Sequence, residues 1–317
     1  MNINNNFTPL AWHQDDIELQ SNRATYAYGH IVPLFASATT FLPFQIVTEP
    51  NYIDVATCTL KLKNVDGSDA LSGANLRSRF GLVKKTVELR PQEVIDEQTT
   101  IPAVNVDVII YNGGNMDALP IGQYYLELTS GQRTWYSDVV TIVSDTTLKT
   151  KITWWDAADL LFGAGCIVYK YGTGNATQYK NVMYFMEEIG MPEYTQEEEG
   201  ETRDGLFYAS KLISGKKYKM QVAQCSEAMC DALRFVHLAD FVEIEDGYGR
   251  QYNCDSVLIT PEWVSGGAVA SAAFEITTDT FVKTVGKTLE GYIPRGVTCE
   301  IGRAVIGENF MIGVVSL

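Results

Sequence analysis

Residues 122–143 read GQYYLELTSGQRTWYSDVVTIV, and this stretch decides the fold class. Tyr124, Leu126 and Leu128 share one face of an extended segment. Ser130 and Gly131 supply a tight turn, after which a β-branched stretch returns along the first strand. The sequence therefore predicts a β-hairpin at these positions.

Two upstream stretches show the alternation of a half-buried strand, at residues 56–63 (ATCTLKLK) and 104–110 (VNVDVII), and each is followed by turn residues. Tyr124 also lies where sandwich domains place a tyrosine corner, whose hydroxyl bonds back to the upstream backbone. Short strands separated by Gly, Pro and Asn turns predict an immunoglobulin-like or fibronectin-like β-sandwich.

The pattern pauses at residues 144–147, where we place a boundary, and the segment beyond it is mixed. It contains one helix signal, with Ser226 as N-cap and an apolar face of Met229, Ala232, Leu233 and Val236. We expect this face to pack on a sheet. Strands are predicted at residues 149–154, 166–170, 181–187, 217–222, 241–245, 251–259 and 269–284.

The predicted fold is mainly β. It begins with an extended N-terminal arm (1–39) and continues with a β-sandwich domain (40–146), a β-rich α+β domain with one helix (147–285) and a C-terminal tail (286–317). We expect the two domains to have separate cores. The arm lacks apolar periodicity and the tail has apolar runs without a domain to bury them, so both ends are expected to contact neighbouring copies in a closed ring.

The charge balance argues against nucleic-acid binding, because the chain has a formal net charge of -15 and a pI near 4.6. An acidic wall repels DNA, which suits a conduit that DNA slides through, although solubility alone also explains the charge. We expect no membrane segment, since the most apolar stretch (31–47) is interrupted by Pro33, Pro43 and hydroxyl residues. The first residues do not resemble a secretory signal.

No residue pattern predicts catalysis, a cofactor or a metal. His13, His30 and His237 are not adjacent to a nucleophile signature. The thiols of Cys225, Cys230 and Cys254 with His237 lack zinc spacing. We expect all six cysteines to be reduced, buried thiols.

Two acidic stretches are also interpreted without a ligand. The run at residues 193–204 is predicted to be a solvated loop. Residues 64–69 (NVDGSD) resemble half of a calcium loop but lack its later glutamate, which favours a simple turn.

Aromatic residues are numerous, with 17 Tyr, 13 Phe and 5 Trp, and they are more informative about function than the histidines, cysteines or acidic stretches. Such residues anchor protein interfaces but also fill cores. Adjacent Trp154 and Trp155 on a strand point to opposite faces, so one of them needs a second layer or a partner. The candidate interface residues are Trp154, Trp155, Trp263, Tyr292 and Phe310.

Eight phrases between residues 24 and 285 resemble virion proteins of phages of Bacteroides-type bacteria, including crAss-like phages. They are 24–34 (ATYAYGHIVPL), 42–46 (LPFQI), 136–139 (YSDV), 152–156 (ITWWD), 203–205 (RDG), 230–234 (CDALR), 248–252 (YGRQY) and 260–263 (TPEW). The resemblance implies a non-enzymatic tail, neck-ring or baseplate subunit that is assembled in the host cytoplasm with other tail and neck proteins. It implies no catalytic residues.

Two other functions stay open at this point. A surface-binding or carbohydrate-binding β-sandwich module would use exposed aromatic side chains. A hydrolase would use the acidic run, but no paired acid and base occur in a recognisable arrangement.

Overall fold

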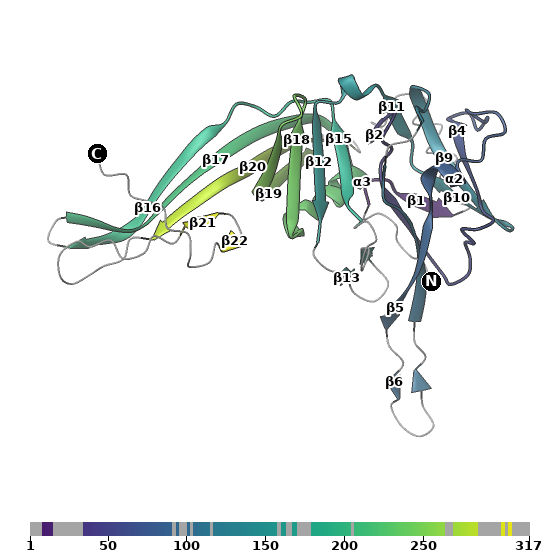
Figure 1. Cartoon of the computed structure of the whole chain (residues 1–317), viewed down its shortest axis with the longest axis horizontal. Helices are drawn as coiled ribbons and strands as arrows, with labels where there is room; N and C mark the ends of the chain where they lie inside the picture. Colours follow the sequence, from purple (N-terminus) through teal and green to yellow (C-terminus); the bar gives the residue numbers. More distant parts are fainter. Residues whose placement is uncertain are drawn as a thin grey trace.

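A computed structural model gives the fold of the chain (Figure 1). It describes residues 8–14, 34–90, 93–94, 100–101, 104–114, 117–156, 160–162, 167–169, 179–203, 206–263, 269–284, 299–301 and 304–305.

The first half of the chain forms two facing β-sheets. In chain order it contains β1 (Trp12–Gln14), β2 (Leu34–Ser37), β3 (Phe44–Thr48), β4 (Thr59–Asn64), α2 (Arg77–Phe80), β5 (Val83–Arg90), β6 (Glu93–Val94), β7 (Thr100–Ile101), β8 (Val104–Tyr111), β9 (Gly122–Ser130), β10 (Arg133–Ser137) and β11 (Val140–Val143). Strands β3, β8 and β5 form one sheet, and β1, β10, β9, β11, β2 and β4 belong to the other. The mainly β, sandwich-like fold predicted from the sequence is confirmed.

Aromatic rings join the two layers of this sandwich. The Trp12 ring on β1 lies 4.9 Å from the Phe44 ring on β3, and Phe44 lies 5.4 Å from Tyr111 on β8. Phe80 at the end of α2 closes the cluster, 4.7 Å from Tyr111. These side chains are buried, so the sandwich core depends on rings from both sheets.

The predicted hairpin forms, and its return strand contains an irregularity. Tyr136 opposes Glu127 but Val140 opposes Tyr124, so one extra residue lies between β10 and β11. The Ser137 hydroxyl accepts a hydrogen bond from the Leu126 amide (2.8 Å) within this bulge. The extra residue divides the return strand into β10, which pairs with β1, and β11, which pairs with β2.

The tyrosine corner is also confirmed, because the Tyr124 hydroxyl donates to the Ile121 carbonyl at 3.2 Å. We expect Tyr124→Phe to lower the free energy of unfolding by about 1 kcal/mol, the usual net value of one hydrogen bond. Urea unfolding followed by circular dichroism measures this loss. Tyr248→Phe is the matched control, because Tyr248 is 79% exposed, and an equal loss in both variants would contradict a specific role for the corner.

The second half continues the larger sheet. It contains η1 (Asp145–Thr147), β12 (Thr150–Trp155), β13 (Leu160–Phe162), β14 (Ile167–Tyr169), β15 (Asn181–Phe185), β16 (Glu193–Arg203), β17 (Leu206–Ser226), α3 (Glu227–Leu233), η2 (Val236–Leu238), β18 (Phe241–Asp246), β19 (Gln251–Trp263), β20 (Val269–Thr284), β21 (Cys299–Ile301) and β22 (Ala304–Val305). From β2 onward the strand order is β15, β12, β18, β19, β20, β17, β16.

The predicted helix is confirmed in its cap and in its apolar face. Ser226 accepts a hydrogen bond from the Met229 amide at 3.2 Å, as an N-cap does. The four predicted face residues (Met229, Ala232, Leu233 and Val236) are all buried, the last of them in η2. The helix packs this face against β17.

The two halves share one sheet and one hydrophobic core. Strand β2 lies between β11 of the sandwich and β15 of the second half, where Tyr184 opposes Phe35. Buried side chains from both halves belong to a single cluster. The prediction of two separate cores is therefore wrong, because β2, a short segment of the expected arm, is an interior strand of the sheet.

The described parts of the two ends lie on their own chain rather than on a neighbour. Residues 12–14 pair with β10, and Leu10 and Trp12 are buried. Near the other end, β21 pairs with β20. The expectation that both ends reach onto other copies is thus wrong for these segments, because each completes a sheet of its own chain. The remaining residues of the arm and tail lie outside the described part.

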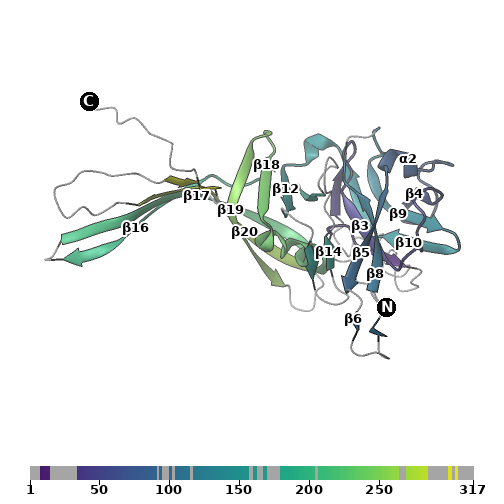
Figure 2. The ribbon, with the colours of Figure 1, turned by 60° about the horizontal axis from the view of Figure 1, so that its bottom comes forward.

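Two extensions project from this body (Figures 1 and 2). Strands β16, β17 and β20 form a long curved ribbon that leaves the sheet on the side away from the sandwich. Strands β5 and β8 continue past the sandwich toward the short β6–β7 pair. None of the helices that the structure describes has the length and apolar character needed to cross a bilayer.

Candidate protein-interaction surface

The projecting ribbon is the part of the molecule that most resembles an interaction surface, and we call it the β-arm. It consists of residues 193–203 of β16, 206–217 of β17 and 277–284 of β20. In both views it extends away from the sandwich (Figures 1 and 2). Isolated two-stranded or three-stranded ribbons are marginally stable in water, so such an extension is stabilised by what it contacts.

Burial stops where the β-arm begins. Towards the body, Tyr218, Met220 and Val222 of β17 are buried against the core. Gly215 marks the change: it is buried between the Thr195 and Thr280 side chains, each 3.3 Å from the position of an added Cβ. Beyond Gly215 no described side chain of the β-arm is fully buried. The distal ribbon therefore lacks a hydrophobic core of its own.

One face of the β-arm is continuous with the core-facing side of the sheet, and this face carries exposed aromatic residues. Tyr194 on β16 is 70% exposed and Phe281 on β20 is 49% exposed. Register places Phe281 in one row with Ser214 and Gln196, and the next row on this face contains Leu212. Exposed rings on a polar ribbon are typical of surfaces that bind another protein.

The opposite face carries a ladder of ion pairs across the strands. Glu193 lies 2.9 Å from Lys219, Glu199 lies 3.3 Å from Lys211, and a third pair joins Lys217 to Glu275 at 3.3 Å. The hydrogen bond that Lys219 donates to the Glu193 carboxylate raises the pKa of Lys219. These groups are exposed, so the pairs contribute little to stability, and their role is to set which strand faces which.

The acidic run predicted to be a loop is the edge strand β16, so that prediction is wrong. Glu193 and Glu199 lie directly opposite Lys217 and Lys211 on β17. These lysines offset the repulsion between neighbouring glutamates, and opposite charges across strands favour pairing. Glutamates on an exposed edge also oppose pairing with a second copy of the same edge.

A shallow groove of about 290 Å³ crosses the β-arm. Each of three adjacent strands contributes three consecutive residues, at 196–198, 212–214 and 281–283. Glu197, Ile213 and Val282 form its middle row. The groove joins acidic and apolar groups on one surface, which suits a protein side chain better than a small ligand needing enclosure.

The structure brings together only some of the predicted interface residues. Trp154 is 1% exposed and belongs to the core, whereas Trp155 lies on the other face of β12. The alternation argument is thus confirmed. Trp263 ends β19 and is 48% exposed, but it is not part of the β-arm. Tyr292 and Phe310 lie outside the described residues.

Trp155 has partners on its own chain. Its ring stacks on Phe241 with centroids 5.3 Å apart, and Lys180 places its ammonium 3.7 Å from the ring centroid. Both neighbours occupy the ring, so Trp155 is less available to a ligand than its partial exposure indicates.

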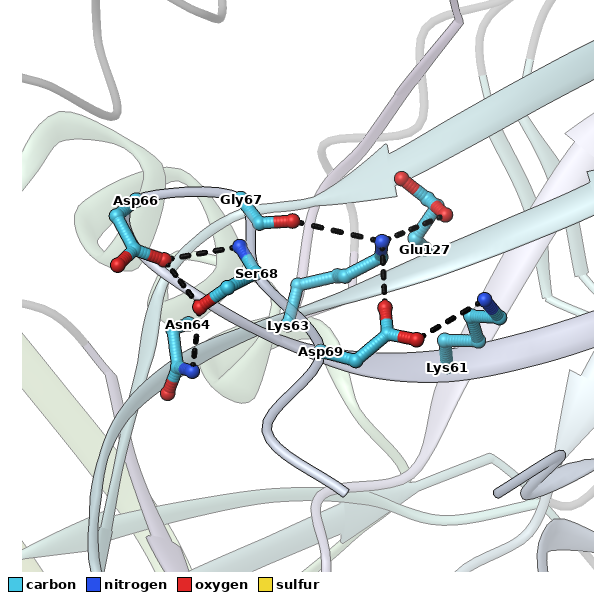
Figure 3. Close-up of polar contacts among 8 residues, drawn as sticks. All are labelled: Lys61, Lys63, Asn64, Asp66, Gly67, Ser68, Asp69 and Glu127. Carbon is cyan, nitrogen blue, oxygen red and sulfur yellow. Dashed lines mark hydrogen bonds and ion pairs between the residues drawn. The ribbon is translucent and has the colours of Figure 1, made fainter. Parts of the chain in front are cut away.

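The half calcium loop is a turn, as predicted (Figure 3). Asp66 accepts hydrogen bonds from the Ser68 amide (2.8 Å) and hydroxyl (2.6 Å). Asp69 points instead to Lys63 and Lys61, at 2.7 and 3.1 Å. The two carboxylates are thus directed to different partners of the turn and do not converge on a common point.

The histidines and cysteines that the structure describes lie in different surroundings. His13 lies 2.9 Å from Asp138 and connects β1 to the bulge, and His237 is exposed. The described thiols are free, as predicted for Cys58, Cys225, Cys230 and Cys254. A hydrogen bond with Cys230, together with burial, raises the pKa of the Cys225 thiol.

No group of three or more potential metal ligands occurs among the described residues. His30 and Cys166 lie outside that part of the chain, and Cys299 is described only in its backbone.

The sequence did not predict Tyr194 as an interface residue because the acidic run was placed in a loop. Phe281 lies in a predicted strand, but its neighbours β16 and the part of β17 before residue 217 were not predicted. The usable signal was the row of lysines between 211 and 219, which matches the glutamates of 193–199 once the two stretches are read as a hairpin.

Comparison with protein-family models, curated proteins and solved structures gives no match to this chain. The resemblance to virion proteins stays a prediction.

Proposed function

We propose that the chain is a structural subunit of a phage tail, neck-ring or baseplate assembly and acts through protein–protein contacts around the DNA conduit. The single observation that carries this proposal is the β-arm, an extended ribbon without its own core that projects from a well-packed body. A ribbon with exposed rings and a free edge strand is stabilised when another subunit covers it.

Charge is consistent with a position beside DNA. A net charge of -15 repels phosphate, so a wall of such subunits lets DNA pass without binding it. The same charge opposes association of free copies in solution. Assembly therefore depends on local complementary surfaces or on a preformed platform.

The alternative function, a carbohydrate-binding module, is less favoured by the aromatic geometry. A sugar platform needs an exposed ring face, but Lys180 and Phe241 cover the Trp155 ring. Trp263 remains a candidate for that function because 48% of its surface is exposed. Binding of the chain to a polysaccharide, lost in Trp263→Ala, would favour this alternative.

Shortening the β-arm tests the proposal. In the register, Thr195 opposes Gly215, so replacing residues 196–214 by Asn-Gly closes a two-residue hairpin. We expect the shortened chain to keep the unfolding midpoint of the wild type, because the removed part has no core. Its incorporation into particles, measured by quantitative mass spectrometry, is expected to fall tenfold or more, about 1.4 kcal/mol of contact energy.

The matched control keeps the β-arm and exchanges one ion pair on it, as Glu199→Lys with Lys211→Glu. This variant is expected to enter particles normally. Normal incorporation of the shortened chain would overturn the proposal that the β-arm is an assembly element.

A further inference from the structure

We propose that the acidic edge strand β16 of one copy pairs with the basic edge strand β5 of a second copy, so that the chain assembles head to tail by sheet extension. This inference depends on the proposed function and adds the partner and the contact. It follows from the two edge strands, their opposite charges and their positions in the molecule.

The acidic edge is long and incompletely neutralised. Strand β16 pairs with β17 on one side, and no described strand pairs with its other side. It contains five glutamates and one arginine (Glu193, Glu197, Glu198, Glu199, Glu201 and Arg203). Glu197 and Glu198 are exposed and form no ion pair with any residue that the structure describes. As consecutive residues of one strand, they place one carboxylate on each face of the β-arm.

The basic edge lies in the sandwich. Strand β5 pairs with β8 on one side and with no described strand on the other. Its sequence, VKKTVELR, has three basic residues and one acidic residue. Val83 is 45% exposed, and Lys84 contacts Asp107 at 3.4 Å while its side chain stays about one-third exposed. This edge offers positive charge and an apolar side chain next to free backbone groups.

Opposite charge selects the pairing of unlike edges. Two β16 edges repel each other through their glutamates, and two β5 edges repel through their lysines. The β16–β5 pair is the combination in which backbone hydrogen bonds and charge attraction act together. It is also the combination able to offset the repulsion between two copies that each carry a charge of -15.

The positions of the edges make the contact head to tail. Strand β16 lies in the β-arm, away from the sandwich that contains β5 (Figures 1 and 2). A copy that donates β16 still presents its own β5 to a third copy. Such heterologous contacts close into a ring or extend as a filament, depending on the rotation between copies.

A charge exchange tests the contact. Variant A carries Glu197→Lys and Glu198→Lys, and variant B carries Lys84→Gln and Lys85→Glu, where the introduced amide group keeps a hydrogen-bond donor near Asp107. Variant A changes the net charge of β16 from -4 to 0, and variant B changes that of β5 from +2 to -1. Each variant alone therefore loses the attraction between its two edges, so we expect sedimentation velocity at low salt to show at least tenfold weaker self-association than wild type. In an equimolar mixture, the unchanged β16 of a B copy meets the unchanged β5 of an A copy, so A and B together are expected to associate although neither does so alone.

The matched control, Glu188→Lys with Glu262→Lys, changes the net charge as variant A does but lies on neither edge. It is expected to associate normally. Failure of the A and B mixture to associate, or a wild-type chain that stays monomeric at all concentrations, overturns the β16–β5 contact. Loss of particle incorporation in the shortened chain together with either result would leave the proposed function standing and indicate a different protein as the partner of the β-arm.

Discussion

Replacing Trp12 by Ala is expected to lower the free energy of unfolding by about 3–5 kcal/mol, the usual range for removing a large buried aromatic side chain. Trp12 is 2% exposed, and its ring lies 4.9 Å from the Phe44 ring across the sandwich. Its loss leaves a cavity between the two sheets. It also weakens β1, which is held to β10 at the edge of the sheet.

Urea unfolding monitored by far-ultraviolet circular dichroism measures this change without relying on tryptophan fluorescence. Trp263→Ala is the matched control, since Trp263 is 48% exposed and its removal is expected to change stability by no more than about 0.5 kcal/mol. A loss below about 1 kcal/mol for Trp12→Ala would contradict the assignment of residues 8–14 to the core of their own chain.

The sequence was most informative where local patterns and tertiary packing agree. The hairpin at 122–143 combines an apolar face with a turn, and the helix after Ser226 combines a cap with a complete apolar face. The strands predicted at residues 241–245 and 251–259 also form, as β18 and β19, and they pair with each other. In each case the residues that define the pattern are the residues that the core buries.

Long-range pairing limited the rest of the fold prediction. Strand β2 has four residues, too few for a periodic signal, yet its neighbours β11 and β15 come from opposite sides of the expected boundary. Strand β1 is shorter still, with three residues. Such segments become strands because a sheet edge is available to them, and that information is not local in the sequence.

The candidate site was predicted only in part, for a related reason. The opposite orientation of Trp154 and Trp155 could be predicted because successive side chains of a strand point to opposite faces of the sheet. The β-arm could not be predicted from the sequence, since a run of glutamates on its own indicates mutual repulsion. The lysines of β17 that offset this repulsion lie opposite the glutamates only in the folded structure. Composition alone therefore predicts a loop where charge compensation between strands allows β16 to form.

Removing the carboxylate of Asp107 is expected to have the second large effect on stability. Asp107 is 1% exposed and accepts hydrogen bonds from the Asn51 amide and the Thr86 hydroxyl, both at 2.7 Å. Lys84 lies 3.4 Å away. Asn51 is the one non-glycine residue with a positive φ (64°) in the described part of the chain, so the carboxylate also holds an unfavourable turn. Asp107→Asn is expected to cost about 2–3 kcal/mol at neutral pH.

The effect of Asp107→Asn is expected to depend on pH in a defined direction. Burial raises the pKa of Asp107, but the hydrogen bonds from Thr86 and Asn51 and the charge of Lys84 outweigh it and hold the pKa below its usual value of 3.8. A carboxyl group with a lowered pKa stabilises the fold above its unfolded pKa, and this stabilisation is lost as the pH falls through the folded value. The stability difference between wild type and Asp107→Asn is therefore expected to be constant near neutral pH and to narrow as the pH falls below 3.8. Urea unfolding at several pH values measures it, with Asp117→Asn, a carboxylate whose side chain is 84% exposed, as the control for general acid effects. A difference that stays constant or widens below that pH would show that the ionised carboxylate is not what holds the Asn51 turn.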